Sequence, residues 1–483
     1  MGIQSIDFVT VAPALALASG ALVVLIVDLF VAKGTRVSGA LALVTVVVAA
    51  VLVPATSGQA TLCVGVACGY AVGSVTLALQ GITLLATGTV VLMSVVTVED
   101  LGIPSGEHFF LLLCSAAGAL LVPATTDLVS MIVALELVSL PTFALIGLHR
   151  GDRRAGEAAL KAFLFSVTSV AISLYGIALL YGSTGTVGFL PLSIASSGAE
   201  PTPIAVAGLV MLLAVIAFKI SAVPFHAWAP DAYEGAPIPV AAFLSVVSKT
   251  AGFGALALVF ATFADWPQVW APPIAVMAVL TMVIANIVAL RQRRAVRLLA
   301  WSSIAQAGYI LVPFGAVVAG VEGSEGLLVP VVAYLVAYAA MNLGAFGVVA
   351  IVSREHLRAR LSDFSGLAWH SPWLGLSLAF FLACLAGLPP GIIGLLVKVQ
   401  VIAVPVATGA WWLVAAMAVA TVIGLAYYLS WAAVLFQRPV AEERAESARS
   451  AVLPMQVAVG AMLVVTVALS VAPSLALGLL ERL

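Results

Sequence analysis

The chain has 483 residues, of which 63% are hydrophobic and only 8% are charged. With a mean hydropathy of +1.21, this composition excludes a water-soluble domain and indicates a polytopic membrane protein. The net charge of −1 excludes a strongly basic nucleic-acid surface and an acidic tail. The sequence carries no C-x-x-C, P-loop or G-x-G-x-x-G motif, which argues against redox or nucleotide chemistry within this chain.

Apolar runs predict an all-α protein with fourteen transmembrane helices, because a bilayer core needs about 20 apolar residues per helix. The first run has no basic segment before it, so we expect a retained span rather than a signal peptide. The sequences SAVP and GLPP interrupt the seventh and twelfth spans. The spans are expected near 7–32, 37–54, 75–98, 108–122, 126–148, 158–182, 204–222, 237–263, 271–290, 296–319, 327–352, 373–404, 410–436 and 451–479.

Basic residues alternate along the loops between these spans. Loops after even-numbered spans hold no Lys or Arg, and Arg482 is the one arginine that departs from the pattern. Because cytoplasmic loops of membrane proteins are enriched in Lys and Arg, the alternation predicts that both termini lie on the outer side. The residues that follow odd-numbered spans are Lys33, Arg36, Arg150, Arg153, Arg154, Arg291, Arg293, Arg294, Arg297, Arg354, Arg358, Arg360, Arg438, Arg444 and Arg449.

Four of the five lysines lie inside apolar spans, namely Lys161, Lys219, Lys249 and Lys398, and Glu136 is the only acid deep inside one. A basic residue near mid-membrane costs roughly 2.5–3.5 kcal/mol unless it is hydrated or paired. Lysine can release its proton when it is buried, whereas arginine keeps its charge. A changing distance to Glu136 would then make a lysine take up or release a proton. The pattern predicts an ion or proton translocator built on buried lysines.

Simpler explanations exist for some of these residues. Lys161 stands near the start of its span and can extend its ammonium group to the membrane surface. Glu136 can be one partner of a structural ion pair. His226, Asp231 and Glu234 fit no common metal-ligand spacing. We therefore expect His226 and Asp231 to shape a loop at the cytoplasmic access to the broken helix.

Prolines mark the two interrupted helices: Pro224 follows Lys219, while Pro389 and Pro390 precede Lys398. Non-helical backbone at membrane depth is tolerated where it lines a hydrated cavity. Broken helices in corresponding positions of two halves indicate inverted repeats.

We predict four segments on this basis. They are 1–107 with the first three helices, 108–264 with helices 4–8 as a first repeat, 271–436 with helices 9–13 as a second repeat, and 451–483 with the last helix.

Several motifs resemble one family. PFHAWAPDAYEGAPIPVAAFLSVVSK (224–249) is similar to the signature of subunit N of the proton-translocating NADH-quinone oxidoreductase, respiratory complex I. ELVSLPTFAL (136–145), ALKAFLFS (159–166), RLLAWSSIAQAGYIL (297–311) and LPPGIIGLLVK (388–398) agree. DAYEGAP is the most specific, because the related subunits L and M and the Mrp-type antiporters usually carry a different version.

The resemblance implies one proton channel of a redox-driven pump in a bacterial plasma membrane. It implies no cofactor in this chain and places FMN, Fe–S clusters and quinone in partner subunits. The neighbouring membrane-arm subunits, among them M, K and J, are the implied partners.

The resemblance also implies roles for the buried charges. Glu136 and Lys219 resemble the family's glutamate–lysine pair on the fifth and seventh helices. Lys249 resembles the central lysine of the eighth helix, and Lys398 the twelfth-helix lysine at the outward exit. Lys161 resembles the sixth-helix lysine of subunit N.

The tenth span carries polar residues between the expected positions of Lys249 and Lys398. Ser302, Ser303 and Tyr309 can hydrate a path there, or can serve helix packing by small polar residues. Gln306 stands where many family members have histidine, so a hydrogen-bonding group replaces a titratable one.

Cys63 and Cys68 fall in the loop after the second span, on the expected outer side, where an oxidising compartment permits a disulfide. Two other functions remain open. A cation/proton antiporter of the Mrp type would share the buried lysines, and a membrane scaffold would explain the helices but not the lysines.

Overall fold

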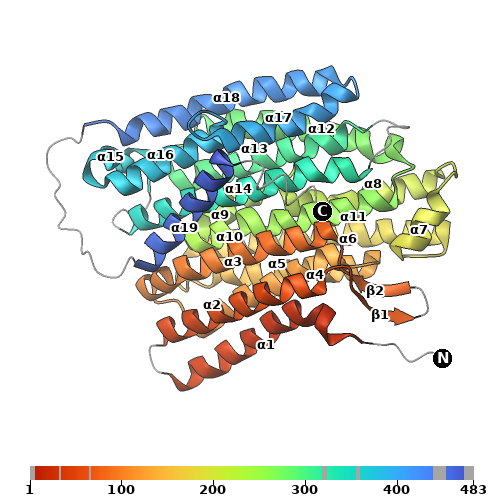
Figure 1. The fold of residues 1–483 in the computed structure, drawn as a ribbon, viewed down its shortest axis with the longest axis horizontal. Coiled ribbons are helices and arrows are strands. Elements are labelled where there is room, and N and C mark those ends of the chain that lie inside the picture. Colours follow the sequence, from red (N-terminus) through yellow and green to blue (C-terminus); the bar gives the residue numbers. More distant parts are fainter. Residues whose placement is uncertain are drawn as a thin grey trace.

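The computed structural model describes residues 6–31, 34–64, 67–317, 324–354, 359–438 and 453–472. Long helices lie side by side along one direction (Figure 1). Thirteen described helices are long and apolar enough to span a membrane. This arrangement satisfies backbone hydrogen bonds within each helix, as a lipid environment requires. The predicted all-α polytopic fold is confirmed.

The helices follow the predicted spans in order. They are α1 (Phe8–Phe30), α2 (Thr35–Leu52), α3 (Ser74–Leu101), α4 (Ser105–Leu121), α5 (Leu128–Gly147), α6 (Arg153–Thr184), α8 (Pro203–Ile220), α10 (Ile238–Phe243) continuing through a π-helix (Leu244–Ser248) into α11 (Lys249–Thr262), α12 (Pro267–Ala289), α13 (Ala295–Gly315), α14 (Ser324–Ser353), α16 (Pro372–Ala386) with α17 (Ile392–Ala407), α18 (Trp411–Leu435) and α19 (Leu453–Val471).

Both predicted interruptions are present. The seventh span ends as α8 at Ile220, and Ser221 then adopts a left-handed conformation with φ of 61°. In the twelfth position the chain forms two helices, α16 and α17, separated by residues 387–391. Each of these two helices is shorter than the others that span the membrane. The broken segments therefore place helix ends inside the bundle.

Several short elements were not predicted. Strands β1 (Ala60–Val64) and β2 (Ala67–Ala71) form an antiparallel hairpin in a segment that we expected to be a loop. Short helices α7 (Phe189–Ser196), α9 (Ala229–Gly235) and α15 (Leu367–His370), and 3₁₀ turns at Val53–Thr56, Val122–Ala124 and Leu361–Phe364, complete the fold. Runs of three to eight residues are too short for a periodic apolar pattern to reveal them.

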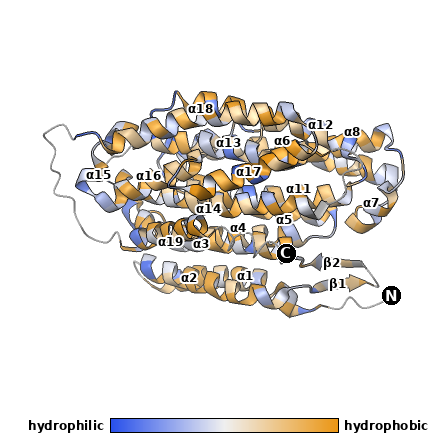
Figure 2. Ribbon diagram, turned by 45° about the horizontal axis from the view of Figure 1, so that its top comes forward, coloured by the Kyte–Doolittle hydropathy of each residue, from blue (hydrophilic) through white to orange (hydrophobic). Residues whose placement is uncertain are grey.

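Hydrophobic residues predominate along the helices (Figure 2), and many large ones are exposed on the outside of the bundle. Small residues let some helices approach closely inside it. A Cβ added to Gly176 of α6 would lie 2.6 Å from the carbonyl oxygen of Gly208 in α8. Glycine at such crossings allows two backbones to touch, as is common between membrane helices. The crossing fixes α8, which carries Lys219, against α6.

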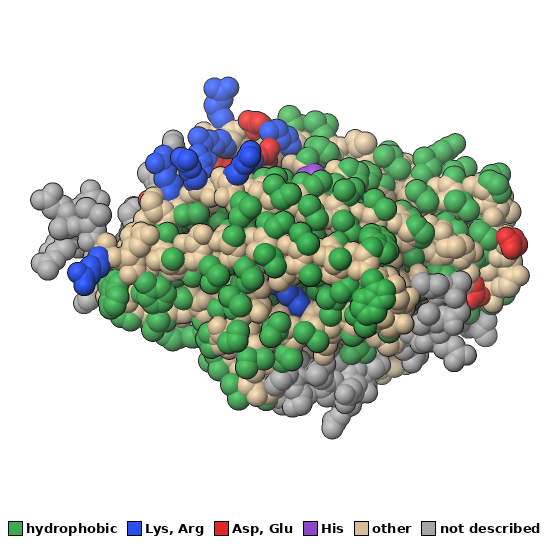
Figure 3. All heavy atoms as spheres, turned by 90° about the horizontal axis from the view of Figure 1, so that it is seen from above, with side chains coloured by type: hydrophobic (Ala, Val, Ile, Leu, Met, Phe, Trp, Pro, Cys, Tyr) green, Lys and Arg blue, Asp and Glu red, His purple; other side chains and the backbone are tan. Residues whose placement is uncertain are grey.

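Most Lys and Arg side chains visible in Figure 3 gather toward one end of the molecule. Arg354, after α14, forms a salt bridge of 2.6 Å with Asp100 of α3. Arg294 and Arg360 form an isolated β-bridge, so the ends of α12 and α14 meet there as well. Loops after three odd-numbered spans thus lie at the same end. Lys33, Arg358, Arg444, Arg449, Arg482 and the part of the last predicted segment beyond 472 fall outside the described residues.

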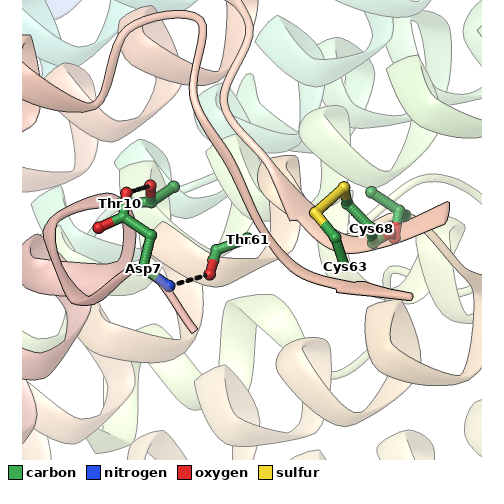
Figure 4. Close-up of a disulfide and its surroundings, with 6 residues drawn as sticks. Asp7, Thr10, Thr61, Cys63 and Cys68 are labelled. Atoms are coloured by element: carbon green, nitrogen blue, oxygen red, sulfur yellow. Dashed lines mark hydrogen bonds between the residues drawn. A yellow bond between two sulfur atoms is a disulfide. The ribbon is translucent and has the colours of Figure 1, made fainter. Parts of the chain in front are cut away.

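The hairpin lies at the end of the molecule where α1 begins (Figure 1). Cys63 and Cys68 face each other across it and are joined in a disulfide (Figure 4). The backbone N–H of Asp7 donates to Thr61 Oγ1 at 2.7 Å. Burial raises the pKa of Tyr70 to about 12, so its hydroxyl stays protonated where Gln80 donates to it. The hairpin thereby connects α1 to α3.

Cys63→Ser is expected to lower the free energy of unfolding by about 2 kcal/mol, since a crosslink over a short loop restricts the unfolded chain only modestly. Thermal inactivation of the assembled complex measures the loss, and peptide mapping with and without reductant tests the bond. Cys114→Ser, at a free cysteine, is the matched control. Free thiols at both positions in the unreduced sample would contradict the disulfide.

Candidate functional site

Glu136 of α5 and Lys219 of α8 form an ion pair inside the bundle. Lys219 Nζ lies 3.5 Å from Glu136 Oε1, and their side chains are 2% and 22% exposed. The hydroxyls of Ser139 and Ser166 donate to the same carboxylate oxygen at 3.3 and 3.4 Å. The pair that the sequence pattern predicted is therefore brought together, with the lysine as the more deeply buried partner.

The end of α8 supplies hydrogen-bond acceptors to the neighbouring helix. Lys249 Nζ donates to the Ile220 carbonyl at 2.9 Å, and Ser248 Oγ donates to the Lys219 carbonyl at 3.2 Å. Carbonyls at a helix C-terminus lack partners within the helix and carry partial negative charge. The break in α8 thus creates a site for the ammonium group of Lys249.

The break between α16 and α17 repeats this arrangement. Lys398 Nζ donates to the carbonyls of Leu385 and Ala386 at 3.2 and 2.9 Å. It also lies 5.2 Å from the centre of the Tyr309 ring, within the range of a cation–π contact. Pro389 and Pro390 lie in the connection that follows α16. Sequence analysis placed Lys219 and Lys398 near the breaks but missed that the ends of the broken helices hold the ammonium groups of Lys249 and Lys398.

The turn before Lys249 is a π-helix, Leu244–Ser248. Such wide turns are rare and occur frequently at functional sites. Nothing in the residues LSVVS distinguishes this turn from an ordinary helix, so the sequence could not have revealed it.

Gln306 of α13 is the centre of a buried polar network beside Lys398. Its Nε2 donates to the Leu385 carbonyl and to the Tyr428 hydroxyl, both at 3.2 Å. Its Oε1 accepts from the Tyr334 hydroxyl. Because Leu385 O also accepts from Lys398, one carbonyl joins Gln306 to the lysine.

A second polar group lies beside the helix turn that precedes Lys249. Tyr338 OH donates to Ser303 Oγ at 2.7 Å and to the Ser245 carbonyl at 3.2 Å. Asn342 Nδ2 donates to Ser245 Oγ at 2.7 Å. Ser302, the neighbour of Ser303 on α13, shares a hydrogen bond with the Tyr428 hydroxyl.

These two hydrogen-bonded groups reach α13 at its adjacent serines, Ser303 on the side of Lys249 and Ser302 on the side of Lys398. We call the two groups together the polar path. Sequence analysis named Ser302, Ser303, Gln306 and Tyr309 but missed Tyr334, Tyr338 and Tyr428. Tyr334, Tyr338 and Asn342 are spaced four residues apart on α14 and so share one helix face. This four-residue spacing of polar side chains was the sequence signal from which a polar face on α14 could have been predicted.

Lys161 is more exposed than the other three lysines of the apolar spans. Its Nζ lies 2.7 Å from Glu157 and 3.0 Å from Asp231, and its side chain is 44% exposed. This position matches the interpretation in which Lys161 reaches the membrane surface.

The remaining predicted residues lie near that surface cluster or near Lys398. Asp231 is on α9, and the His226 ring packs 5.6 Å from the Trp301 ring of α13. Pro224 lies between α8 and α9. The Tyr309 hydroxyl accepts from Asn286 Nδ2 at 3.1 Å.

Tyr428→Phe is expected to reduce proton pumping severalfold while the complex still assembles. The substitution keeps the buried ring but leaves Ser302 and Gln306 without one partner each. NADH-driven acidification of inverted membrane vesicles measures the effect. Tyr181→Phe, at an exposed tyrosine of α6, is the control. Equal pumping in both variants would argue that the Tyr428 hydroxyl carries no protons.

Comparison with known proteins agrees with this architecture. Residues 125–424 match the family described as NADH:quinone oxidoreductase/Mrp antiporter, transmembrane. The chain is 48% identical over 451 residues to NADH-quinone oxidoreductase subunit N 2 of Streptomyces griseus, covering 90% of this chain and 84% of the relative. It is 40% identical to NADH-quinone oxidoreductase subunit N of Salinispora tropica, covering 90% and 86%.

Solved structures share the fold. A chain of respiratory complex I from Thermus thermophilus with bound aureothin aligns with a TM-score of 0.79 at 30% identity, covering 96% of this chain and 98% of that one. A chain of the Mrp complex from Dietzia aligns at 0.83 but with 21% identity, covering 98% and 96%, which shows the fold alone. The chain thus belongs to the NADH:quinone oxidoreductase/Mrp antiporter transmembrane family and, within it, to the N subunits of NADH-quinone oxidoreductase.

Proposed function

We propose that this chain moves protons outward across a bacterial plasma membrane through Glu136, Lys219, Lys249 and Lys398. The names of its relatives support a role within an NADH:quinone oxidoreductase. Quinone reduction elsewhere in the complex would drive the movement. FMN, Fe–S clusters and quinone would then belong to partner subunits, and this chain would hold no cofactor.

The observation that carries the proposal is the shared environment of the two lysines beyond the ion pair. Lys249 and Lys398 each donate to carbonyls at the end of a broken helix, at distances of 2.9–3.2 Å. A carbonyl can accept a hydrogen bond from an ammonium group, yet it brings no full negative charge to hold the proton permanently. Each lysine can therefore bind a proton and pass it on.

The Glu136–Lys219 pair would set the direction of the first transfer. When Glu136 lies close, its charge favours the protonated form of Lys219. When the pair separates, the buried ammonium group loses that support and transfers its proton toward Lys249. Pairing and separation would follow charge changes that arise in the rest of the complex.

Hydroxyl groups would carry the proton from Lys249 toward Lys398. Tyr338 and Ser303 form the first half of the polar path, and Ser302 and Tyr428 form the second. Gln306 would orient Tyr428 rather than exchange protons itself, because an amide side chain does not titrate.

The proposed orientation places the arginine-rich loops in the cytoplasm and both termini outside. The clustering of Asp100, Arg354, Arg294 and Arg360 at one end of the molecule supports it. The relatives are subunits of a multi-subunit complex, and we propose the membrane-arm subunits M, K and J among the partners.

Lys219→Ala tests the proposal in inverted membrane vesicles. NADH-driven acidification and NADH oxidation are expected to fall together, severalfold, in a complex that still assembles. Loss of Lys219 removes the first proton carrier and leaves Glu136 partly exposed, so the residual charge is tolerated. Unchanged pumping and oxidation in the assembled variant would refute the lysine route.

A further inference from the structure

Helix α9 lies between the break in α8 and the charged end of the molecule, and ion pairs hold it from two sides. Asp231 is shared, because its Oδ2 lies 3.0 Å from Lys161 Nζ of α6 and its Oδ1 lies 3.1 Å from Arg297 Nη1 of α13. Glu234 pairs with Arg297 at 2.6 Å and with Arg294. These side chains are all partly exposed, so water reaches the cluster.

The same helix is connected to both parts of the proposed proton route. Trp228, directly before α9, donates its Nε1–H to the carbonyl of Phe218, the neighbour of Lys219. The Tyr233 hydroxyl of α9 shares a hydrogen bond of 3.4 Å with Ser303 in the polar path. A displacement of α9 would therefore alter the hydrogen bonds next to Lys219 and at Ser303.

The contacts of α9 with α6 and with α13 differ in kind. Gly235 lets the backbone of α9 lie against α6, since an added Cβ would come within 2.6 Å of Ala158 Cβ and 2.9 Å of the Arg154 carbonyl oxygen. The contact with α13 includes the long side chains of Arg294 and Arg297. Close-packed backbone tends to move as one body, whereas flexible ion pairs between hydrated side chains exchange readily.

Two buried nitrogens near this second contact have no hydrogen-bond partner among the described residues. They are His226 Nδ1, just before α9, and Trp301 Nε1, on α13. Their rings lie 5.6 Å apart. Unpaired buried polar groups are costly, and contact with water would satisfy both.

We propose that α9 is a gate that controls cytoplasmic access to Lys219 and that opens along its contact with α13. In the closed state described here, Arg294 and Arg297 hold α9 against α13. On opening, Asp231 stays with Lys161, α9 moves together with α6, and water reaches the end of α8. Arg297 is a positioning residue in this scheme. The inference rests on the proposed proton route through Lys219.

A cysteine reporter tests the gate directly. Ser221 follows α8 immediately and is buried, so Ser221→Cys reports access to the Lys219 region with little change in side-chain size. The assembled complex in inverted vesicles is treated with a membrane-impermeant methanethiosulfonate reagent. Mass spectrometry then follows modification of the peptide that contains position 221, so that native cysteines do not interfere.

Arg297→Gln in the Ser221→Cys background is expected to raise the modification rate at least about tenfold, because the open state gains population when the pair is lost. Arg297→Lys keeps the charge but replaces the planar guanidinium group, whose Nη1 contacts both Asp231 and Glu234, so an intermediate rate is expected. Arg293→Gln is the matched control: Arg293 is exposed at the same end, and its loss should leave the rate unchanged.

An unchanged rate in an assembled Arg297→Gln complex would overturn the gate. If that variant fails to assemble, Glu234→Gln removes the pairs of Glu234 with Arg297 and Arg294 from the side of α9, and hydrogen–deuterium exchange of residues 229–235 gives the readout. Exchange equal to that of the wild-type complex would likewise overturn the gate. Both readouts are independent of proton pumping. A faster modification rate in the Arg297→Gln variant would support the gate. If pumping by the separate Lys219→Ala variant were also unaffected, the proton route would be refuted while the gate stood.

Discussion

Lys249→Met is expected to reduce NADH-driven proton pumping by at least about tenfold, the low end of what loss of a proton-transfer group costs. Lys249 is 1% exposed and lies between the Glu136–Lys219 pair and the polar path. Methionine has a similar length and packs well in apolar surroundings. The substitution therefore removes the proton carrier while it preserves the volume of the core.

Assembly should survive this change, because replacing a buried charge by an apolar side chain is often neutral or stabilising. Native gels establish the amount of complex, and acidification of inverted vesicles measures pumping against NADH oxidation. Arg36→Met removes an exposed cation of α2 and serves as the matched control. Normal pumping by the Lys249→Met complex would eliminate this residue as a carrier and the route with it.

Gly394→Ala is expected to prevent stable assembly. A Cβ added to Gly394 would overlap the carbonyl oxygen of Cys384, and one added to Gly391 would overlap its Sγ. Both glycines lie against the backbone of Cys384 in α16, so an added Cβ would have to move α17 away from α16. Overpacking typically costs about 1–3 kcal/mol and more where backbone atoms collide. The displaced helix is the one that carries Lys398, so function should be lost with stability.

Native gels and thermal inactivation of the complex measure this effect. Gly81→Ala on α3 provides the control, since an added Cβ there meets nothing within 4 Å. Alanine is the better helix former, so that variant should be neutral or slightly stabilised. Equal stability of the two variants would show that the contact between α16 and α17 is looser than the structure indicates.

The sequence was sufficient for the long apolar helices and for the two breaks. Apolar runs long enough to cross a bilayer have few alternatives to a helix, so each predicted span has its counterpart. The hairpin with Cys63 and Cys68 was missed as strands, although its disulfide partners were named. Five-residue strands outside the membrane carry too little pattern to stand out.

The candidate site was only partly predictable. Glu136 and Lys219 stood out because isolated charges in apolar helices are costly. Tyr338 and Tyr428 did not, since tyrosine is common in membrane proteins and its role depends on which neighbour its hydroxyl meets. Lys161 was grouped with the buried lysines because its span looks apolar, but acids from its own helix and from α9 hold it near the surface. The partners of the tyrosine hydroxyls and the position of Lys161 both depend on how close neighbouring helices lie. The sequence pattern of a single helix does not contain that information.

The acceptors for Lys249 and Lys398 are main-chain atoms, and this determines how the two sites respond to mutation. Any residue at position 220, 385 or 386 presents a carbonyl, so side-chain scanning there will report on shape and not on proton binding. The site is encoded by where a helix stops rather than by the residue at its end. Substitutions at these buried positions are therefore limited by packing alone, while an alteration that lets α8 or α16 continue as helix would remove the acceptor in one step.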